Sequence, residues 1–348
     1  MIEDLRHIIS NFQLHGQLVH LRPTAIGLIN DTFYIETNSD SDLYKYILQK
    51  VNVFVFPHPE RIMDNIAIVG EVLQASDYSL RILKAVPSKS GSDLFQYAEN
   101  SYWRLFPFIE NTYTINTVED ASIAYEAAFS FGEYTRYIGE VNPKHLHTTI
   151  PNFHNTPFRF LQFKNTLQQA DTERQRLASK EIEILLSYQH LLATYEAFSH
   201  IIRPVHYDTK INNILFDKTT DRPKAIIDLD TLMPGALPYD FGDMVRTYTP
   251  TVDENERDWK EVKVRPNILR AITNGYLDGL KDSIHPLEKK HLTDGAVLII
   301  YEQAVRFLED FLLGDPYYRV DYPEQNLYRT RNQIALLKDY LGRLSGMR

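Results

Sequence analysis

The chain has 348 residues, of which 43% are hydrophobic and 24% are charged, and its formal net charge at pH 7 is −9. It contains no cysteine, which excludes disulfides, thiolate nucleophiles, zinc–thiolate sites and iron–sulfur clusters. Nucleic-acid binding depends on Lys and Arg that neutralise phosphates, so a chain this acidic favours other partners. We expect no nucleic-acid partner, and the sequence indicates no obligate protein partner.

Hydropathy indicates the cellular location of the protein, and chain length indicates the number of its domains. The longest apolar runs, such as residues 296–301, fall far short of the ~18 residues of a membrane helix. Residues 1–6 have neither the basic nor the apolar region of a signal peptide. We therefore expect a cytoplasmic protein without membrane contact, and the length favours two lobes.

The first part of the chain is predicted to be rich in β-structure. Helical apolar spacing marks residues 2–12 and 59–75. Runs of β-branched and aromatic residues predict strands at 18–26, 32–37, 43–51, 80–86 and 102–109. We expect these elements to form an N-lobe at residues 1–110, in which an antiparallel sheet covers a nucleotide.

From residue 118 onward helices dominate. Apolar periodicity predicts helices at 118–137, 157–169, 171–199, 259–280, 286–313 and 323–341, the last of them ended by Gly342. An irregular block at 202–246 interrupts them and contains two short buried strands, at 214–216 and 225–227. We place the C-lobe at residues 111–348, so the sequence predicts an α+β fold with a β-rich N-lobe and a mainly helical C-lobe.

The irregular block carries the pattern that points to chemistry. Residues 206–213 read H-x-D-x-x-x-x-N, the catalytic-loop pattern of kinase-like folds, and Asp228 follows the next apolar run. Phosphoryl transfer needs positioning and charge neutralisation, so Asp208 would accept the proton of the attacking hydroxyl. Asn213 and Asp228 offer the hard oxygen ligands that Mg²⁺ prefers. Asp230 is either a second metal ligand or a structural hydrogen-bond acceptor.

The pattern also has ordinary interpretations. His206 could be a core histidine, and Asp208 could cap a turn, because H-x-D-x-x-x-x-N alone is short. The apolar run that ends in Asp228, behind a β-rich region, favours a kinase. We expect Asp240 to bond the backbone of the catalytic loop, so the triplet Asp240-Phe241-Gly242 is not the metal-binding motif.

The nucleotide would be held by the first turn and the third strand. The turn at 25–32 contains Gly27, Asn30 and Thr32 and could cover a triphosphate with N–H groups, although it could also be an ordinary hairpin turn. Kinases place a lysine on the third strand, and here Gln49 holds that position. Either Gln49 donates a neutral hydrogen bond or a bulge turns Lys50 inward, and strand alternation favours Gln49.

Several longer segments carry a family resemblance, and they lie at 27–32, 46–49, 209–215, 226–235, 306–308 and 322–331. They resemble the aminoglycoside phosphotransferase and choline kinase superfamily, and within it the N-acetylhexosamine 1-kinases. The resemblance implies a bilobed protein-kinase-like fold that binds ATP, with Asp208 as the base and Mg²⁺ on Asn213 and Asp228. It also implies that Arg306 and Tyr317 contact a sugar.

Within this resemblance we expect Lys210 of the catalytic loop to contact the nucleotide. Leu28 departs from the family, which has a histidine there. By its sequence context alone, Arg306 could instead form ion pairs along one helix face with Glu302 and Asp310. Tyr317 follows the helix stop Gly314-Asp315-Pro316, where a loop aromatic could stack on a sugar ring.

The implied reaction is Mg-ATP-dependent phosphorylation of the anomeric hydroxyl of N-acetylglucosamine or N-acetylgalactosamine, which gives the sugar 1-phosphate. One alternative is a kinase for another sugar or for a choline-like or aminoglycoside-like alcohol. A second alternative is a non-catalytic module that binds a nucleotide or a sugar. Asp208, Asn213 and Asp228 are all present, which favours an enzyme.

Overall fold

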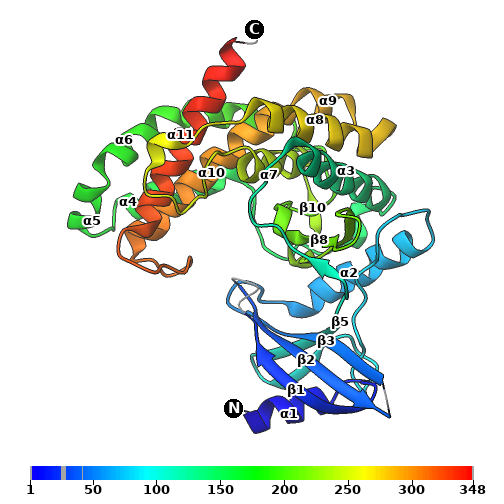
Figure 1. The fold of residues 1–348 in the computed structure, drawn as a ribbon. Coiled ribbons are helices and arrows are strands. Elements are labelled where there is room, and N and C mark those ends of the chain that lie inside the picture. The colour runs from blue at the N-terminus through cyan, green and yellow to red at the C-terminus, as the bar shows by residue number, and fades with distance from the viewer. Residues whose placement is uncertain (1, 25–28, 41, 347–348) are drawn as a thin grey trace. The chain divides into compact units, whose positions relative to one another are not determined.

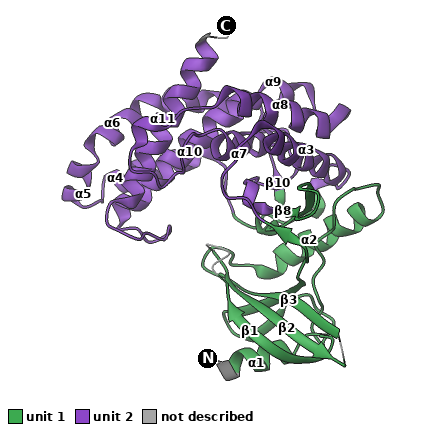
Figure 2. Cartoon of the chain, viewed as in Figure 1, with its two compact units in different colours: residues 1–113, 144–150, 215–233 green, residues 114–143, 151–214, 234–348 purple. Residues whose placement is uncertain are grey.

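The computed structural model describes residues 2–24, 29–40 and 42–346. Its elements follow one another as Figure 1 shows, with strands concentrated early in the chain and helices late. The chain forms two compact units (Figure 2): unit 1 contains residues 1–113, 144–150 and 215–233, and unit 2 contains residues 114–143, 151–214 and 234–348. The division into lobes at residue 110 stays a prediction, since the units alternate along the chain.

A five-stranded antiparallel sheet dominates unit 1, in the order β1-β2-β3-β5-β4. Helix α1 (Ile2–Ser10) packs on one of its faces, where Ile8 and Phe12 join Tyr46 and Leu48 in a buried core. Alternation along β3 therefore places Gln49 on the opposite face. The strands are β1 (Gln17–Pro23), β2 (Asp31–Ser39), β3 (Asp42–Val51), β4 (Phe95–Ala98) and β5 (Ser101–Pro107).

Helix α2 (Pro59–Gln74) begins with proline, whose fixed φ suits a first helical position. Its apolar stripe includes Ile62, Ile66 and Val69, which are buried as the periodicity predicts. The fully buried Asn65 donates to the carbonyl oxygens of His147 and Leu232, both at 2.8 Å. Asn65 thus ties α2 to two later segments of unit 1, because a buried amide without these partners would cost free energy.

The strand predicted at 80–86 is wrong. Only the two ends of this segment form backbone contacts of the β type. Arg81 forms an isolated bridge with Ala225, and the N–H of Val86 donates to the carbonyl oxygen of Leu105 at 2.7 Å. The edge position beside β5 is taken instead by β4, which follows a turn-rich stretch and pairs through an irregular register. An apolar run predicts burial here but cannot tell which of two segments pairs with β5.

Two small sheets contain the strands that precede and follow the catalytic-loop segment in the sequence. Strands β6 (Thr112–Tyr113), β8 (Ile214–Asp217) and β9 (Pro223–Ile226) form one of them, in the order β6-β8-β9. Strand β7 (Arg203–Val205) pairs with β10 (Met233–Gly235), the strand at which the chain passes from unit 1 to unit 2. The two buried strands predicted in the irregular block are thus confirmed as β8 and β9.

Unit 2 is built around α10, whose residues are almost all buried and which packs against α4, α7 and α11. One of its helices begins with a capping side chain: the Asp120 carboxylate accepts from the N–H groups of Ser122 and Ile123 at the start of α3. The helices are α3 (Ala121–Ile138), α4 (Thr156–Leu167), α5 (Thr172–Leu177), α6 (Ser179–Ser187), α7 (Pro238–Tyr248), α8 (Pro266–Leu280), α9 (Pro286–Lys290), α10 (Leu292–Leu313) and α11 (Gln325–Gly346).

Three predicted helix boundaries are corrected. The helix predicted from residue 259 starts at Pro266, because the residue before a proline is driven to an extended conformation. The helix predicted at 171–199 divides into α5, α6 and a 3-10 segment, Tyr188–Ala197. Gly342 does not end α11, since a glycine inside an exposed helix costs only about 1 kcal/mol. The predicted α+β fold, β-rich first and mainly helical later, is confirmed.

Candidate active site

The H-x-D-x-x-x-x-N segment forms a tight loop in unit 2 between β7 and β8. The amide nitrogen of Asn213 donates to the Asp208 side chain and to its main-chain oxygen, both at 2.9 Å. Lys210 Nζ lies 3.2 Å from Asp208 Oδ1. Three predicted site residues are therefore in contact. Because both bonds use the amide nitrogen, the amide oxygen is what Asn213 would offer to a cation.

The charge state of Asp208 suits a proton acceptor. Burial raises the pKa of this carboxyl, but Lys210, His206 and the hydrogen bond from Asn213 lower it by more. The pKa of Asp208 therefore lies below its ordinary value, and the side chain is a carboxylate at neutral pH. Its side chain is 22% exposed, so an incoming hydroxyl could reach it.

Asp240, in the first turn of α7, holds the loop. Its two carboxylate oxygens accept the main-chain N–H groups of His206 at 3.0 Å and Tyr207 at 2.8 Å, and its carbonyl oxygen accepts from the Thr209 hydroxyl at 2.7 Å. The predicted structural role of Asp240 is confirmed. Burial raises the pKa of Asp240, to about 7, while the two N–H bonds oppose the shift. The triplet that begins with Asp240 lies inside a helix.

Tyr207 adopts a left-handed conformation, with φ of 63°. Its hydroxyl accepts the N–H of Ala236 at 2.8 Å, and a Cβ atom on Gly235 would overlap its ring. Only glycine at 235 lets the backbone pass this close. The ring and its hydroxyl thus fix the backbone directly before Asp208, at a residue where β-branched or bulky side chains rarely take positive φ.

Asp228 and Asp230, both in unit 1, differ sharply in environment. Asp228 is exposed and left-handed, with φ of 59°, at the start of a 3-10 turn, Leu229–Thr231. Asp230 is only 2% exposed, and its Oδ1 lies 2.6 Å from Nη1 of Arg104. Arg104 Nη2 and Asn30 Nδ2 both donate to Asp230 Oδ2, at 2.9 and 2.8 Å. Asp230 is therefore buried against Arg104 and Asn30, whereas Asp228 is exposed.

The predicted nucleotide residues of unit 1 belong to the same network. Gln49 Oε1 accepts from Arg104 Nε at 3.0 Å, and Gln49 Nε2 lies 3.4 Å from the Thr32 hydroxyl. Asn30 also accepts the N–H of Asn52 at 2.9 Å through its amide oxygen. The remaining predicted residue, Gly27, lies outside the described residues, as does Leu28. The sequence interpretation missed Arg104, although an arginine inside the apolar run 102–109 was the available signal.

Arg306 and Tyr317 lie together in unit 2. The Arg306 guanidinium lies 5.4 Å from the ring centre of Phe153 and 5.7 Å from those of Tyr317 and Tyr318. Such contacts contribute about 0.5–2 kcal/mol each. Among the described residues no carboxylate lies within ion-pair distance of Arg306, so the predicted alternative of a helix-face ion pair does not form.

The acids that could have paired with Arg306 have other partners. Glu302 accepts from His154 at 2.8 Å and from the Thr156 hydroxyl at 2.6 Å. Asp310 accepts the main-chain N–H groups of Tyr317 and Tyr318, both at 2.9 Å, and so fixes the loop that follows α10. The loop begins at Gly314, whose φ of 92° ends the helix.

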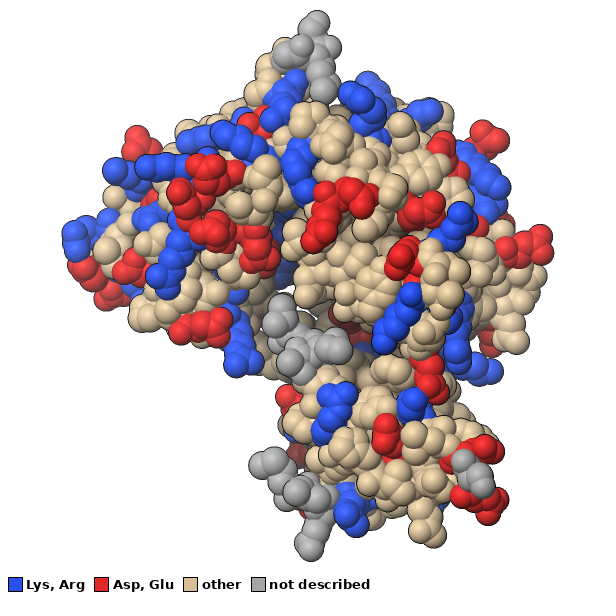
Figure 3. Space-filling model, viewed as in Figure 1, with Lys and Arg blue, Asp and Glu red and all other residues tan. Residues whose placement is uncertain are grey.

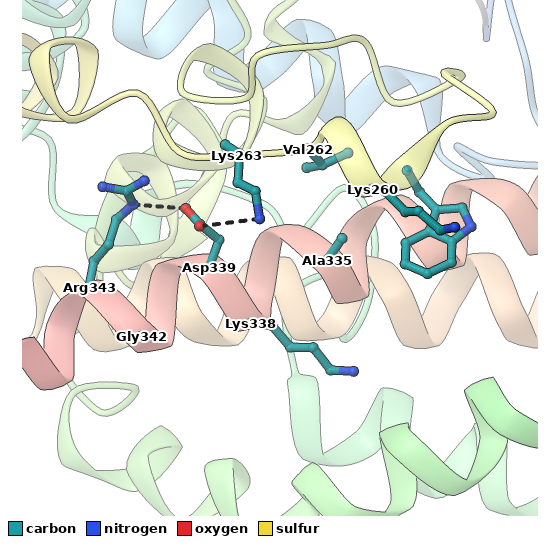
Figure 4. A pocket seen from close by; sticks show the side chains of 9 residues that line it. Lys260, Val262, Lys263, Ala335, Lys338, Asp339, Gly342 and Arg343 are labelled. Carbon is teal, nitrogen blue, oxygen red and sulfur yellow. Dashed lines mark hydrogen bonds and ion pairs between the residues drawn. The ribbon is translucent and has the colours of Figure 1, made fainter.

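Unit 2 has a groove whose lining includes none of the predicted site residues (Figure 4). It has a volume of about 680 Å³ and runs between the 259–263 segment and α11. The Asp339 carboxylate, which lines the groove, lies 2.8 Å from Arg343 Nε and 3.9 Å from Lys263 Nζ. These three charged side chains of the groove therefore pair with one another. On the face drawn in Figure 3, basic and acidic side chains are likewise interspersed.

Comparison with known proteins identifies the class. The model of the phosphotransferase enzyme family matches residues 20–276, so the chain belongs to this family. It is an ATP-dependent small-molecule kinase. The predicted resemblance to phosphotransferases is therefore confirmed at the level of the family. No helix among the described residues is long and apolar enough to cross a membrane.

Solved structures share the fold at low identity. A microcompartment-associated aminopropanol kinase is 14% identical with a TM-score of 0.68, and the match covers 100% of this chain and 99% of that one. An aminoglycoside phosphotransferase from Alicyclobacillus acidocaldarius is 12% identical with a TM-score of 0.63, covering 97% and 95%. A choline kinase from Cryptosporidium parvum is 13% identical with a TM-score of 0.56, covering 100% and 96%.

Proposed function

We propose that this kinase phosphorylates the anomeric hydroxyl of N-acetylhexosamines, N-acetylglucosamine or N-acetylgalactosamine, and releases the sugar 1-phosphate. The observation that carries the proposal is the Arg306 cluster. A guanidinium without a carboxylate partner among the described residues is left to donate to a ligand. Tyr317 beside it is 37% exposed, which suits stacking on a sugar ring.

Asp208 is the proposed base. It is a carboxylate at neutral pH, held by Asn213 and Lys210, and can accept the proton of the attacking hydroxyl as the bond to phosphorus forms. An anomeric hydroxyl is more acidic than an ordinary alcohol, so a carboxylate with a low pKa suits this acceptor. Lys210, which lies beside Asp208, would in addition contact the nucleotide.

The proposed metal is Mg²⁺, held by Asn213 and Asp228. The donor set fits: the Asn213 amide oxygen faces away from its hydrogen bonds to Asp208, and Asp228 is exposed. Two protein ligands are enough, because Mg²⁺ keeps several waters and binds phosphate oxygens. When bound, Mg²⁺ supplies charge neutralisation on the transferring phosphates.

The proposed nucleotide contacts are Gln49, Asn30 and Thr32, together with Gly27, which lies outside the described residues. Gln49 contacts both Arg104 and the Thr32 hydroxyl, and Asn30 joins the same network through Asp230. A neutral amide at position 49 can donate to a phosphate oxygen, though without the charge of a lysine. We place Asp230 with Arg104, as a structural acceptor.

The acceptor is the part of the proposal most open to test. A matched panel of N-acetylglucosamine, N-acetylgalactosamine, glucose, galactose, choline and an aminoglycoside is supplied with Mg-ATP, and ADP release is followed. We expect kcat/KM to be at least tenfold higher for an N-acetylhexosamine than for any other acceptor. Preferential turnover of choline or an aminoglycoside would replace the hexosamine by an amino alcohol. Leu28 removes a polar contact and would shift preference among sugars by about 1 kcal/mol.

A further inference from the structure

Gln49 and Arg104 are direct partners across the β3–β5 ladder. Arg104 is only 2% exposed, yet its guanidinium contacts two polar side chains, Gln49 and Asp230. A buried ion pair is weak evidence for stability, because well-packed apolar residues would do as well. A different role for the buried Arg104 follows from its effect on the orientation of the Gln49 amide.

An arginine side chain has five N–H donors and no acceptor. The oxygen of the Gln49 amide must therefore face Arg104, and the amide NH₂ must face away from it. The structure has this orientation: Oε1 lies 3.0 Å from Arg104 Nε, and Nε2 lies on the Thr32 side. Without the arginine, the two ends of the amide could exchange places and present an acceptor where a phosphate needs a donor.

Asp230 completes the arrangement. It contacts both terminal nitrogens of Arg104, and so holds the plane of the guanidinium and leaves Nε pointing at Gln49. Protein kinases pair the lysine of the third strand with a carboxylate. Here the buried cation stands one strand further along, on β5, and its carboxylate is Asp230.

We propose that Arg104 is a positioning residue that orients the Gln49 amide as a hydrogen-bond donor to the nucleotide phosphates, with Asp230 as its counter-ion. The inference rests on the proposed nucleotide site. It does not depend on the acceptor, because the donor acts on the nucleotide alone. It also assigns Asp230 to Arg104 rather than to the metal.

The test measures ATP affinity by calorimetry, without acceptor or turnover. Gln49→Glu keeps the shape and an oxygen for Arg104 but removes the NH₂ donor. We expect it to weaken ATP binding at least tenfold while the midpoint of thermal unfolding stays within a few degrees of wild type. Lys50→Gln, on the other face of β3, is the matched control and should bind ATP as wild type does. ATP binding of Gln49→Glu within twofold of wild type would overturn the proposal.

A double-mutant cycle separates positioning from a merely structural role. Gln49→Ala and Arg104→Met should each weaken ATP binding, and the double variant should bind no more weakly than the worse single variant, because both remove the same donor. Losses that multiply would mean that Arg104 acts independently of Gln49, against the proposal. Should Arg104→Met fail to fold, Arg104→Lys takes its place in the cycle, because lysine keeps a cation beside Asp230 without the Nε donor that faces Gln49. Failure of the hexosamine assignment would leave all these affinities unchanged.

Discussion

The main-chain N–H of Tyr207 donates to Oδ1 of Asp240 at 2.8 Å, across 33 positions of sequence. Together with the bond from the N–H of His206, it places both oxygens of one buried carboxylate directly behind the residue that precedes Asp208. The geometry of the proposed base is therefore set from α7, which does not itself carry the catalytic pattern.

Asp240→Asn replaces one accepting oxygen by an NH₂ group, which would face a main-chain N–H. We expect the free energy of unfolding to fall by about 1–3 kcal/mol, the cost of leaving a buried donor unsatisfied, and kcat to fall with it. Urea denaturation and steady-state kinetics measure the two effects. The exposed Asp282→Asn is the control. Unchanged stability in Asp240→Asn would mean that these bonds contribute nothing.

The same carboxyl predicts a pH dependence of stability. Burial raises the pKa of Asp240 to about 7, above the ordinary unfolded value of about 3.9. The folded state then binds a proton that the unfolded state has lost, so this group's contribution is complete below about pH 4 and is lost as the pH rises through about 7. Unfolding free energies measured between pH 5 and 8 should fall more steeply in wild type than in Asp240→Asn. Equal slopes would contradict the raised pKa.

Asp208→Asn tests the base. We expect kcat to fall by roughly 10² or more, the lower end of the cost of losing a general base, while Mg-ATP still binds. The lowered pKa of Asp208 keeps it a carboxylate at neutral pH, and the amide of Asn cannot accept the proton in its place. Steady-state kinetics with ATP affinity from calorimetry provide both numbers. Turnover within a few-fold of wild type would show that another group takes the proton.

Asp228→Ala tests the metal. The exposed carboxylate and the Asn213 amide are the proposed ligands, so this variant should lose Mg²⁺-dependent activity, and EDTA should abolish activity of the wild type. Asp258→Ala, at another exposed acid, serves as the control and should respond to Mg²⁺ as wild type does. Full activity of the wild type in EDTA would contradict the assignment of a Mg²⁺ site.

Gln49 stands on β3 where kinases have a lysine, and this leads to a prediction about ATP binding. Gln49 lies on the face opposite α1, whereas Lys50 follows the alternation of Tyr46 and Leu48. Gln49→Ala should therefore raise the KM for ATP, and Lys50→Ala should leave it nearly unchanged. Initial rates at varied ATP and fixed acceptor measure both. The reverse pattern would mean that Lys50 reaches the nucleotide.

Local patterns predicted most of the fold because helices and strands leave periodic traces. The stripe of α2 and the alternation in β3 were both legible in the sequence. The strand predicted at 80–86 was wrong because pairing with β5 depends on competition with β4, which no local pattern records. Helix ends were displaced where a proline or an exposed glycine had to be weighed against neighbouring turns.

The candidate site was predictable where its residues are close in sequence. Asp208 and Asn213 share one short pattern, and Asp240 could be assigned to the loop backbone because it follows soon after. Arg104 was missed because its partners, Gln49 and Asp230, lie 55 and 126 positions away. A buried cation shows its role only when those partners are seen together.

We propose that the acceptor is the anomeric hydroxyl of an N-acetylhexosamine. The direct measurement is ³¹P NMR of the product formed from Mg-ATP and N-acetylglucosamine or N-acetylgalactosamine, with a parallel assay of the reducing end. We expect a sugar 1-phosphate resonance and loss of the reducing-end signal in proportion to the ADP released. A phosphorylated product that keeps its reducing end, such as a 6-phosphate, or no turnover of either sugar, would contradict it.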